Sequence, residues 1–411
     1  MSYRMLSVSS MYPGFLDAFY NDNPDLIPAD YEANYKALMA DSTEFAASYS
    51  RTLSRLGMSV HTIISNDDIL QKKWGAEHLI KAKGKEKIII QQIKYYQPKI
   101  LWIEDFRFID IDTLSALKER VSSIKLIIGY HCAPISASTL RKLQKTDMTI
   151  TCTPGIKKQL EDSGVNAYLV YHGFDTDLSD KNVNEPIVPS SPVVFTGSLY
   201  QGEGYHNDRI DLIEYLIGRG IKIDLFGNIE SGCRIGVKKG LNLIYRALKK
   251  LKIGQPKRYC SALKWGRSPV RQYPQPIIES VRRPVFGAEL YSMIRNTQIV
   301  LNSHAEVAGD YAGNMRLFEV TGNGSCLLTD NKLNMADLFE PGKEVVVYND
   351  GEDCANKIKW LLENETERIK IARAGQQRTL KDHTVEIRCR IIMEIIRREM
   401  GIREQAKRDK N

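Results

Sequence analysis

Apolar and polar positions along the first 180 residues alternate between two patterns. Short apolar runs stand between longer stretches in which apolar residues recur every three or four positions. The runs expected to form strands are residues 5–8, 60–64, 100–103, 124–130, 148–152 and 167–171. Runs of this kind, buried on both faces and separated by helices, predict a parallel sheet with right-handed crossover connections.

Helix boundaries in this half carry their own signals. Apolar residues repeat at helical spacing from Tyr35 to Leu56, which predicts one amphipathic helix there. Gly57 follows at the position of a C-cap glycine. Thr153 and Pro154 have the order typical of an N-cap and a first-turn proline, in a helix that ends at Gly164.

The alternation stops once and then starts again. Residues 181–192 are polar and contain three prolines, which predicts a linker. Further apolar runs lie at 193–197, 221–227, 298–302, 325–330 and 344–349. We therefore expect an α/β protein in which two Rossmann-like domains, residues 1–180 and 193–382, face each other across a cleft. C-terminal helices should close the domains, with residues 383–411 packing back toward the N-terminal one.

Composition narrows the class of protein. No apolar run approaches the roughly 18 residues of a membrane span, and the first residues lack the apolar core and cleavage site of a secretory signal. The seven cysteines are scattered and include no C-x-x-C pair. This pattern predicts reduced thiols in a cytoplasmic protein and argues against disulfides or a zinc site.

Charge is concentrated in residues 228–286, called the basic segment below. Fourteen Lys and Arg there face only two Glu, a net charge of +12, so the rest of the chain carries −4 of the total +8. A surplus of this size points to a partner rather than to the fold. Around Leu241–Leu251 apolar and cationic residues alternate as in an amphipathic helix, which favours peripheral attachment to an anionic membrane surface on the cytoplasmic side. A solvated insertion is the alternative.

Four blocks in the second half resemble a known family. They are VVFTGSLYQGEGYHNDRIDLIEYLIGRGIKIDLFG, VFGAELYSMIRNTQIVLNSHAEVAGDYAGNMRLFEVTGNGSCLLTD, NMADLFEPGKEVVVYND and IARAGQQRTLKDHTVEIR. They resemble the glycosyl transferases group 1 type with the GT-B fold, in the branch related to spore maturation proteins of the CgeB kind. The resemblance spans residues 193–390, interrupted by the basic segment. The N-terminal half resembles the same branch more weakly, through LWIEDF, IIGYHCAPIS and VYHGFD.

The resemblance implies a glycosyltransferase that moves a sugar from a nucleoside diphosphate sugar to a hydroxyl acceptor. The C-terminal domain would hold this donor, and the N-terminal domain a sugar, lipid-linked or protein acceptor, in the synthesis of cell-surface polysaccharide or glycoconjugate. No cofactor is implied. Cations of the protein would meet the diphosphate charge, so no metal is expected; the D-x-D triplets at 110–112 and 175–177 do not follow a strand of the nucleotide half.

Several donor contacts follow from residue type and position. Gly197 and Ser198 end the strand 193–197, where a glycine lets a diphosphate approach the backbone. Gly227 ends the next strand, and Gly14 follows the first strand of the chain. Arg209 lies at the start of the following helix and can bind a phosphate through two N–H groups. An ordinary strand-end glycine and a solvated helix residue are the alternative interpretations.

A second group of donor contacts follows from the resemblance. Glu319 matches the glutamate that accepts hydrogen bonds from the ribose hydroxyls, and a carboxylate suits a vicinal diol. Asn314 and Arg316 match diphosphate or sugar contacts, and His304 matches a histidine that reaches the donor. Retaining enzymes of the group carry another glutamate eight residues before the ribose one. Tyr311 stands there instead, which leaves retention or inversion open.

Two residues of the N-terminal half are candidate catalytic groups. His131 and Asp105 each follow a predicted strand, and the carboxyl ends of parallel strands meet at one edge that faces the cleft. His131 could act as a base or touch the donor, and Asp105 could act as a base if the reaction inverts. Either residue could instead cap a loop.

Three other functions compete with sugar transfer. The missing second glutamate is compatible with a non-catalytic protein that binds nucleotide-sugars on the same scaffold. An epimerase of nucleotide-sugars is a neighbouring possibility on this fold. Aromatic residues interleave the cations of the basic segment, as in nucleic-acid-binding proteins. A basic face alone is more often an electrostatic surface, so no nucleic-acid partner is expected.

Overall fold

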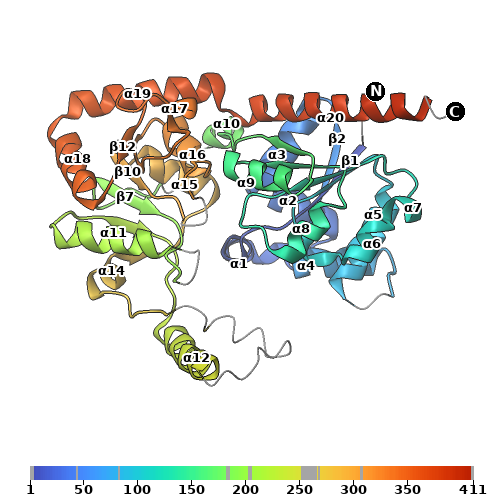
Figure 1. Ribbon diagram of the computed structural model, residues 1–411, viewed down its shortest axis with the longest axis horizontal. Coiled ribbons are helices and arrows are strands. Elements are labelled where there is room, and N and C mark those ends of the chain that lie inside the picture. Colours follow the sequence, from blue (N-terminus) through green and yellow to red (C-terminus); the bar gives the residue numbers. More distant parts are fainter. Residues whose placement is uncertain are drawn as a thin grey trace.

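The structure is a computed structural model that describes residues 4–42, 45–81, 84–181, 186–201, 206–250, 266, 269–305 and 309–408. These residues form two parallel sheets of six strands each, with helices packed around both (Figure 1). The predicted α/β fold with two Rossmann-like domains is therefore confirmed. None of the helices in the described ranges is both long enough and apolar enough to cross a membrane.

The N-terminal sheet has the strand order β2-β1-β3-β4-β5-β6. Its strands are β1 (Arg4–Ser9), β2 (Ser59–Ile64), β3 (Ile100–Ile103), β4 (Leu126–Tyr130), β5 (Met148–Thr151) and β6 (Ala167–Leu169). All neighbouring strands are parallel, so their carboxyl ends lie along one edge. Strands β3, β4 and β5 are buried at every position, which explains their continuous apolar runs.

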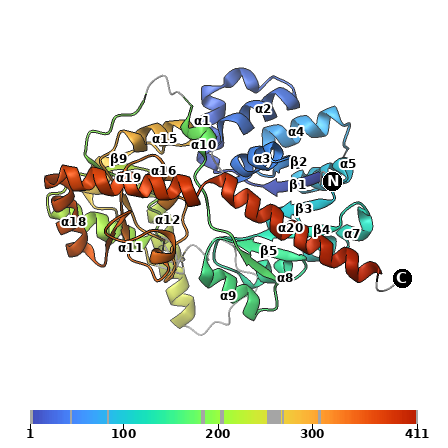
Figure 2. The same ribbon diagram turned by 90° about the horizontal axis from the view of Figure 1, so that it is seen from above.

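Helices cover both faces of this sheet (Figure 2). The helices of this domain are α1 (Pro13–Asp22), α2 (Tyr31–Asp41), α3 (Phe45–Arg55), α4 (Asp68–Glu77), α5 (Lys85–Tyr96), α6 (Ile111–Ser115), α7 (Leu117–Arg120), α8 (Ala137–Leu143) and α9 (Pro154–Asp162), with short 3-10 turns η1 (Pro24–Leu26) and η2 (Phe106–Phe108). The following helix, α10 (Thr176–Ser179), packs its Leu178 in an apolar cluster of the C-terminal domain. Alternate strand residues face opposite sides. Leu101 and Ile103 pack with one set of helices, and Ile100 and Trp102 with the other.

The single helix expected from Tyr35 to Leu56 is wrong, because two helices, α2 and α3, occupy this range. The backbone of Ser42 after α2 is extended, so the first helix ends there. Arg51 of α3 donates hydrogen bonds to the carbonyls of Met39 (2.6 Å) and Ser42 (3.0 Å). One guanidinium thus caps the end of the preceding helix, and both helices keep the same apolar periodicity. The positive φ of Gly57, +93°, confirms the glycine that ends α3.

The C-terminal sheet has the strand order β12-β11-β10-β7-β8-β9 and is also parallel. Its strands are β7 (Val193–Thr196), β8 (Asp224–Phe226), β9 (Val281–Arg282), β10 (Ile299–Asn302), β11 (Cys326–Asp330) and β12 (Val346–Tyr348). Its helices are α11 (Asn207–Gly218), α12 (Gly232–Lys250), α14 (Gln275–Ser280), α15 (Gly287–Arg295), α16 (Arg316–Gly322), α17 (Met335–Leu338), α18 (Gly351–Glu363) and α19 (Glu365–Asp382). The two-residue strand β9 is too short to be recognised from periodicity.

The end of the expected linker is folded onto the C-terminal domain. The amides of Ser190 (2.6 Å) and Ser191 (3.1 Å) donate to the carboxylate of Asp224 at the start of β8. These contacts hold the chain at the entrance of β7. Residues 182–185 of the linker lie outside the described residues.

The last helix, α20 (Val385–Arg408), returns to the N-terminal domain and lies across it (Figure 2). Its residues Cys389, Ile392 and Ile396 pack into the same buried cluster as Leu53 and Trp102.

The chain passes between the two domains where α20 begins. The amide of Phe174 donates to the carbonyl of His383 (2.8 Å), and the amide of Val385 donates to the carbonyl of Phe174 (2.9 Å). A Cβ on Gly173 would lie 2.8 Å from backbone atoms of Thr384 and Val385. Only glycine therefore fits at this crossing.

Helix α12, the described part of the basic segment, projects away from both sheets (Figure 1). It is attached near its start, where the ammonium of Lys238 lies 2.5 Å from the carboxylate of the buried Glu230. Apolar side chains Val237, Leu243 and Ile244 are exposed along it. The amphipathic helix expected here exists, but half of its apolar residues face solvent. Residues 251–265, 267 and 268 of the basic segment lie outside the described residues.

Candidate functional site

The carboxyl edges of the two sheets face each other. Gly155, after β5, lies against Tyr311, after β10: a Cβ at Gly155 would lie 2.9 Å from the Tyr311 ring. A Cβ at Gly313 would lie 2.7 Å from the carbonyl oxygen of Cys152. Two close approaches thus join the loops after β5 and β10, and this is the region in which parallel α/β sheets bind ligands.

Gly14 stands on the N-terminal side of this junction. It lies in the first turn of α1, and its Cβ position is 3.4 Å from the ring of Phe286 in the other domain. Phe286 also packs edge-on against Phe15. The structure therefore places Gly14 opposite the nucleotide half, as a donor contact requires, although a protein side chain already packs against it.

The two strand-end glycines of the C-terminal domain, Gly197 and Gly227, pack against each other. Gly197 has a φ of +150°, a conformation that favours glycine. A Cβ on Gly227 would lie 1.9 Å from the carbonyl oxygen of Gly197, so the backbones of β7 and β8 touch where the strands end. Close packing of the two strands explains Gly227 without any ligand. Ser198, the next residue after Gly197, contributes its carbonyl to the contact of Arg209.

Arg209 is a partly buried cation at the same strand ends. Its Nε donates to the carbonyl of Ser303 (2.6 Å) and its Nη1 lies 3.4 Å from the carbonyl of Ser198. Its guanidinium also lies over the ring of Phe195. Burial lowers the pKa of Arg209 to about 10, so the group stays charged at neutral pH. Among the described residues no carboxylate forms an ion pair with it, which is an arrangement that an anionic ligand would complete.

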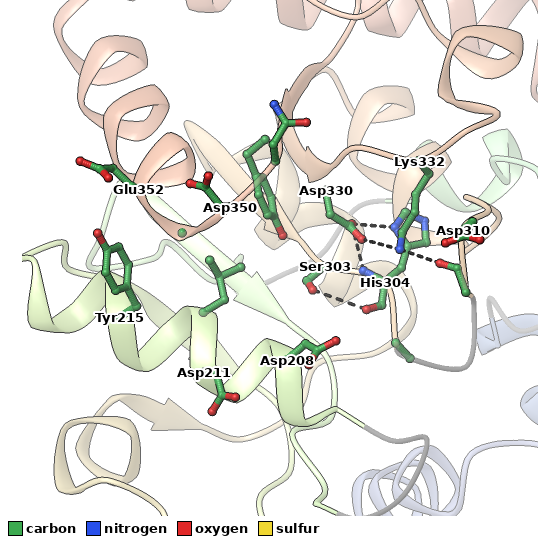
Figure 3. Close-up of a pocket in the computed structure, with 16 residues that line it drawn as sticks. Asp208, Asp211, Tyr215, Ser303, His304, Asp310, Asp330, Lys332, Asp350 and Glu352 are labelled. Atoms are coloured by element: carbon green, nitrogen blue, oxygen red, sulfur yellow. Dashed lines mark hydrogen bonds and ion pairs between the residues drawn. The ribbon is translucent and has the colours of Figure 1, made fainter.

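His304 and Asp330 form a second polar pair at this edge (Figure 3). The His304 Nδ1 lies 2.7 Å from Asp330 Oδ1, and the His304 side chain is fully buried. Burial alone would raise the pKa of Asp330, but the hydrogen bond and charge of His304, with the charge of Lys332, hold it at about 2. An ionised Asp330 requires Nδ1 to carry the proton. The Nε2 of His304 is buried without a hydrogen-bond partner and can bind a ligand.

The residues singled out around α16 form a polar row beside Arg209. Asn314 donates through Nδ2 to Oδ1 of Asn302 (2.8 Å) at the end of β10. The Nη1 of Arg316 donates to Oε2 of the buried Glu319 (2.6 Å), while its Nε is buried without a partner. The predicted i,i+3 pair therefore exists, and it leaves one N–H of Arg316 for a ligand.

A cavity of about 720 Å³ opens beside His304 (Figure 3). It lies at the carboxyl ends of β10, β11 and β12, between the first turns of α11 and α18. Its charged lining is Asp208, Asp211, Asp310, Asp330, Asp350 and Glu352 with Lys332. Six carboxylates against one lysine repel a diphosphate, which must lie toward Arg209 and Arg316. Such a wall suits hydroxyl groups, since carboxylates accept hydrogen bonds from a diol.

The two residues predicted at the N-terminal edge, His131 and Asp105, differ in how strongly they are engaged by other protein groups. His131 follows β4, is half-buried and has its Nε2 3.4 Å from the carbonyl of Pro134. Asp105 is buried, caps η2, and accepts from the amide (2.9 Å) and Nε (2.8 Å) of Arg107 as well as from the hydroxyl of Ser65. Burial opposes ionisation, but these hydrogen bonds lower the pKa of Asp105. Asp105 is thus engaged in capping a loop, and His131 is the freer of the two.

Sequence reasoning missed Glu104, the neighbour of Asp105. Burial raises its pKa to about 7, against a hydrogen bond from Ser9 that lowers it. Its Oε2 is buried and has no hydrogen-bond partner. A carboxyl group that titrates near neutral pH at the end of a central strand is suited to proton transfer. Nothing in the sequence distinguishes it from Asp105, because the two differ in contacts that only the fold creates: Asp105 accepts from Ser65 and Arg107, whereas Oε2 of Glu104 has no partner among the described residues.

Sequence reasoning also missed a cluster of Cys132, Cys152 and His172. Their ligand atoms all lie within 4.8 Å of one another. The sequence argument considered only a C-x-x-C pair, whereas the ends of adjacent parallel strands bring together residues that lie 20 positions apart in the chain.

The D-x-D triplets have structural partners. In the second triplet Asp175 accepts from Arg51 and Asp177 from Arg55 (both 2.6 Å). In the first, Asp110 caps α6.

Known proteins resemble parts of this sequence and share its fold. Residues 242–394, more than a third of the chain, match a family model described as glycosyl transferase-like. No curated protein matches the chain in sequence. The chain resembles a glycosyltransferase from Rickettsia africae ESF-5 with a TM-score of 0.55 at 12% identity, over 97% of this chain and 99% of that one. It resembles Anabaena HepE in complex with UDP and glucose with a TM-score of 0.55 at 12% identity, over 96% and 99%.

A third structure, sucrose-phosphate synthase from Thermosynechococcus elongatus, has a TM-score of 0.55 at 10% identity, over 97% of this chain and 100% of that one. Likeness at such identities shows the fold. The chain has the GT-B fold. Its C-terminal domain carries the glycosyl transferase-like segment, which contains His304, Asn314, Arg316 and Glu319.

One departure within the glycosyl transferase-like segment has a structural explanation. Tyr311, where a second glutamate was expected, packs its ring on Gly155 of the N-terminal domain. The position therefore supports the contact between the two GT-B domains.

Proposed function

We propose that the protein transfers a sugar from a nucleoside diphosphate sugar to a hydroxyl acceptor. The observation that carries the proposal is Arg209, a partly buried cation that has no ion-pair partner among the described residues, at the strand ends of a GT-B nucleotide domain. Arg316, with a buried N–H free of protein partners, lies in the glycosyl transferase-like segment. Together these cations can neutralise a diphosphate leaving group.

The donor class follows from the same edge. HepE, which shares the fold, has been determined with UDP-glucose, and we propose a uridine-type or related donor for this chain. Glu319 would accept the ribose hydroxyls, and the acidic cavity with the Nε2 of His304 would face hydroxyl groups of the donor. The narrower relationship to the CgeB branch, and a role in cell-surface polysaccharide, stay predictions.

The proposed reaction exchanges one bond for another at the anomeric carbon. The acceptor oxygen forms a bond to that carbon while the bond to the phosphate oxygen breaks, and the nucleoside diphosphate leaves with its electron pair. The acceptor proton passes to a base. We propose Glu104 as that base and His131 as a contact to the donor sugar, both at the N-terminal edge of the cleft. Cationic side chains would take the place of a divalent metal at the diphosphate.

Turnover of nucleotide-sugars tests the proposal. A thermal-shift panel of UDP, GDP, dTDP and CMP selects the base first, since a ligand at 100 times its Kd stabilises the protein by about 2.7 kcal/mol. Release of the selected nucleoside diphosphate from its sugars is then measured with and without EDTA. We expect release that survives the chelator. Activity that disappears and returns with Mg²⁺ or Mn²⁺ contradicts the metal-free diphosphate site.

A non-catalytic nucleotide-sugar binding protein is the second candidate function. Tyr311 favours it, because the position of a donor-sugar glutamate is used for packing between the domains. Tight binding of a nucleotide-sugar without transfer or hydrolysis, across a panel of acceptors, would establish this alternative. Interconversion of two sugars without release of nucleoside diphosphate would instead indicate an epimerase.

Glu319→Ala is expected to weaken nucleotide binding and leave the fold intact. Charge-assisted hydrogen bonds to the ribose are worth roughly 1.5–3 kcal/mol, which corresponds to about 10–100-fold in Kd. The same change releases Arg316, so Glu319→Gln, which keeps the side-chain volume, is the companion variant. Calorimetric titration with the selected nucleoside diphosphate measures both. An unchanged Kd in both variants removes Glu319 from the ribose role.

We also propose that α12 attaches the enzyme to an anionic membrane surface, near a lipid-linked or other anionic acceptor. Its exposed apolar side chains lie among the exposed cations Arg234, Lys239, Arg246, Lys249 and Lys250, as an interfacial helix requires. Each cation near such a surface contributes about 1 kcal/mol. Wild-type protein should sediment with anionic vesicles at low salt, and much less at high salt or with neutral lipid. Protein that stays in the supernatant with anionic vesicles supports a solvated insertion instead.

A further inference from the structure

Three residues with soft ligand atoms meet at the carboxyl edge of the N-terminal sheet. Cys132, Cys152 and His172 follow β4, β5 and β6, which are neighbours in the sheet. Tyr130 lies opposite Ile150 in the strand register. Each cysteine stands two residues beyond one member of this pair, so both project from the same face of the sheet. The fold thus assembles the cluster from the loops that follow three neighbouring strands.

The ligand atoms are close to the geometry of a metal site. The two Sγ atoms and a ring nitrogen of His172 lie within 4.8 Å of one another, and neither cysteine is in a disulfide. Bond lengths of about 2.3 Å for Zn–S and 2.0–2.1 Å for Zn–N place neighbouring ligands of a tetrahedral ion about 3.4–3.8 Å apart. Side-chain shifts of about 1 Å suffice to close the site.

We propose that Cys132, Cys152 and His172 bind a zinc-class metal ion with three protein ligands. Two sulfurs and one imidazole nitrogen select Zn²⁺ and similar ions, whereas Mg²⁺ and Ca²⁺ require oxygen ligands. Cys152 is 3% exposed, but Cys132 and His172 are only half-buried. A fourth coordination position is therefore open toward these two residues, where water or an oxygen of a bound molecule can enter.

Surrounding groups hold the proposed ligands in place. The hydroxyl of Tyr130 lies 3.5 Å from the Nδ1 of His172, a contact that is kept if the metal binds at Nε2. Metal-binding histidines usually have such a partner on the second nitrogen. The Nε of Arg388, from α20, donates to the carbonyl of His172 (3.0 Å). Helix α20 and strand β4 thus both contribute contacts that orient this ligand.

The site lies at the junction between the domains. The carbonyl of Cys152 is the group that approaches Gly313 most closely apart from Thr153, and Gly313 precedes Asn314 of the donor half. An ion bound to the Cys152 sulfur therefore restrains the loop on which the two domains touch. This inference concerns the N-terminal domain and is independent of the donor site.

Metal binding is tested on the full reduced chain, with Zn²⁺ and Co²⁺ as the probes. We expect one equivalent of Zn²⁺, release of thiol protons on binding, and a thiolate-to-cobalt charge-transfer band with Co²⁺. Cys132→Ser and His172→Gln should each weaken Zn²⁺ binding by more than about 100-fold, beyond the 10–100-fold typical of residues that only support a ligand. Cys233→Ser is the matched control, because Cys233 is an exposed thiol on α12 and should bind Zn²⁺ like the wild type.

Three results would overturn the proposal. They are substoichiometric Zn²⁺ with no cobalt charge-transfer band, stoichiometric binding that Cys132→Ser and His172→Gln leave unchanged, and a reduced protein that takes up no metal but forms a Cys132–Cys152 disulfide on oxidation. Cys152 is the most buried of the three proposed ligands. A Cys152→Ser variant is therefore used only to support the result obtained with Cys132→Ser and His172→Gln. Circular dichroism of each apo variant keeps loss of fold separate from loss of ligand. None of these readouts depends on sugar transfer.

Discussion

Arg209→Gln is expected to weaken binding of the selected nucleoside diphosphate roughly 100-fold. The guanidinium is partly buried at the ends of β7 and β10, and no carboxylate in the described part of the chain pairs with it. Its loss removes one or two charge-assisted hydrogen bonds to the diphosphate, about 3 kcal/mol in total. Stability of the ligand-free protein should stay the same or rise, because an uncompensated buried charge disappears. Calorimetric titration and thermal unfolding measure the two quantities.

The opposite directions of these two effects make the test specific. A purely structural arginine would lower stability when replaced, and its nucleotide affinity would fall only as the fold does. Arg219→Gln is the control, because Arg219 lies at the other end of α11 and is half-exposed. Wild-type affinity in Arg209→Gln would show that the diphosphate binds elsewhere.

Glu104→Gln is expected to lower kcat by about 100–10,000-fold, the usual contribution of a general base. The same variant should change the pH profile. Burial raises the pKa of Glu104 to about 7, so kcat/KM of the wild type should rise as pH increases through about 7, where the carboxyl loses its proton. This limb should be absent in Glu104→Gln. Rates are measured on metal-free enzyme, because a cation near Cys132 would lower the pKa of Glu104.

Two comparisons decide the assignment of the base. Asp105→Asn, one residue away, should reduce stability through lost capping and leave the acidic limb in place. His131→Gln should raise KM for the donor, with a smaller effect on the limb if His131 only contacts the sugar. If Glu104→Gln retains wild-type kcat and Asp105→Asn or His131→Gln loses the limb, the proposed base is wrong. A retaining reaction needs no base from the protein, and kcat would then be insensitive to all three changes.

The sequence predicted the two sheets because both depend on local patterns. Every apolar run that was expected to form a strand does contain a strand. Strand β9 had no predicted counterpart. The break within the expected helix 35–56 was missed, because Ser42 ends α2 through a contact with Arg51 from the next helix. Apolar periodicity indicates which side of a helix is buried. It does not reveal a break between two helices when the same apolar spacing continues across the break.

The candidate site was only partly predicted, because some of its features depend on contacts that only the folded chain creates. A strand end pointed to His131, a helix start to Arg209 and the family resemblance to His304, and the structure places all three near the carboxyl edges of the sheets. Glu104 and Asp105 differ in that the carboxylate of Asp105 caps the following turn η2. The sequence does not indicate which of two adjacent carboxylates does so. Residues 132, 152 and 172 are brought together only when the sheet order is known.

The path of α20 has a consequence for the order in which the protein can fold. The apolar cluster on one face of the N-terminal sheet includes Cys389, Ile392 and Ile396, which are translated only after the whole of the C-terminal domain. Until they emerge, Trp102 and Leu53 lack part of their cover, although some 300 residues of the chain separate them from this helix. Because domains generally fold as units during synthesis, the first domain to be translated here should be the last to become stable. A release of the chain before residue 385 would strand a folded nucleotide domain beside an N-terminal domain with an exposed apolar face, a species prone to aggregation.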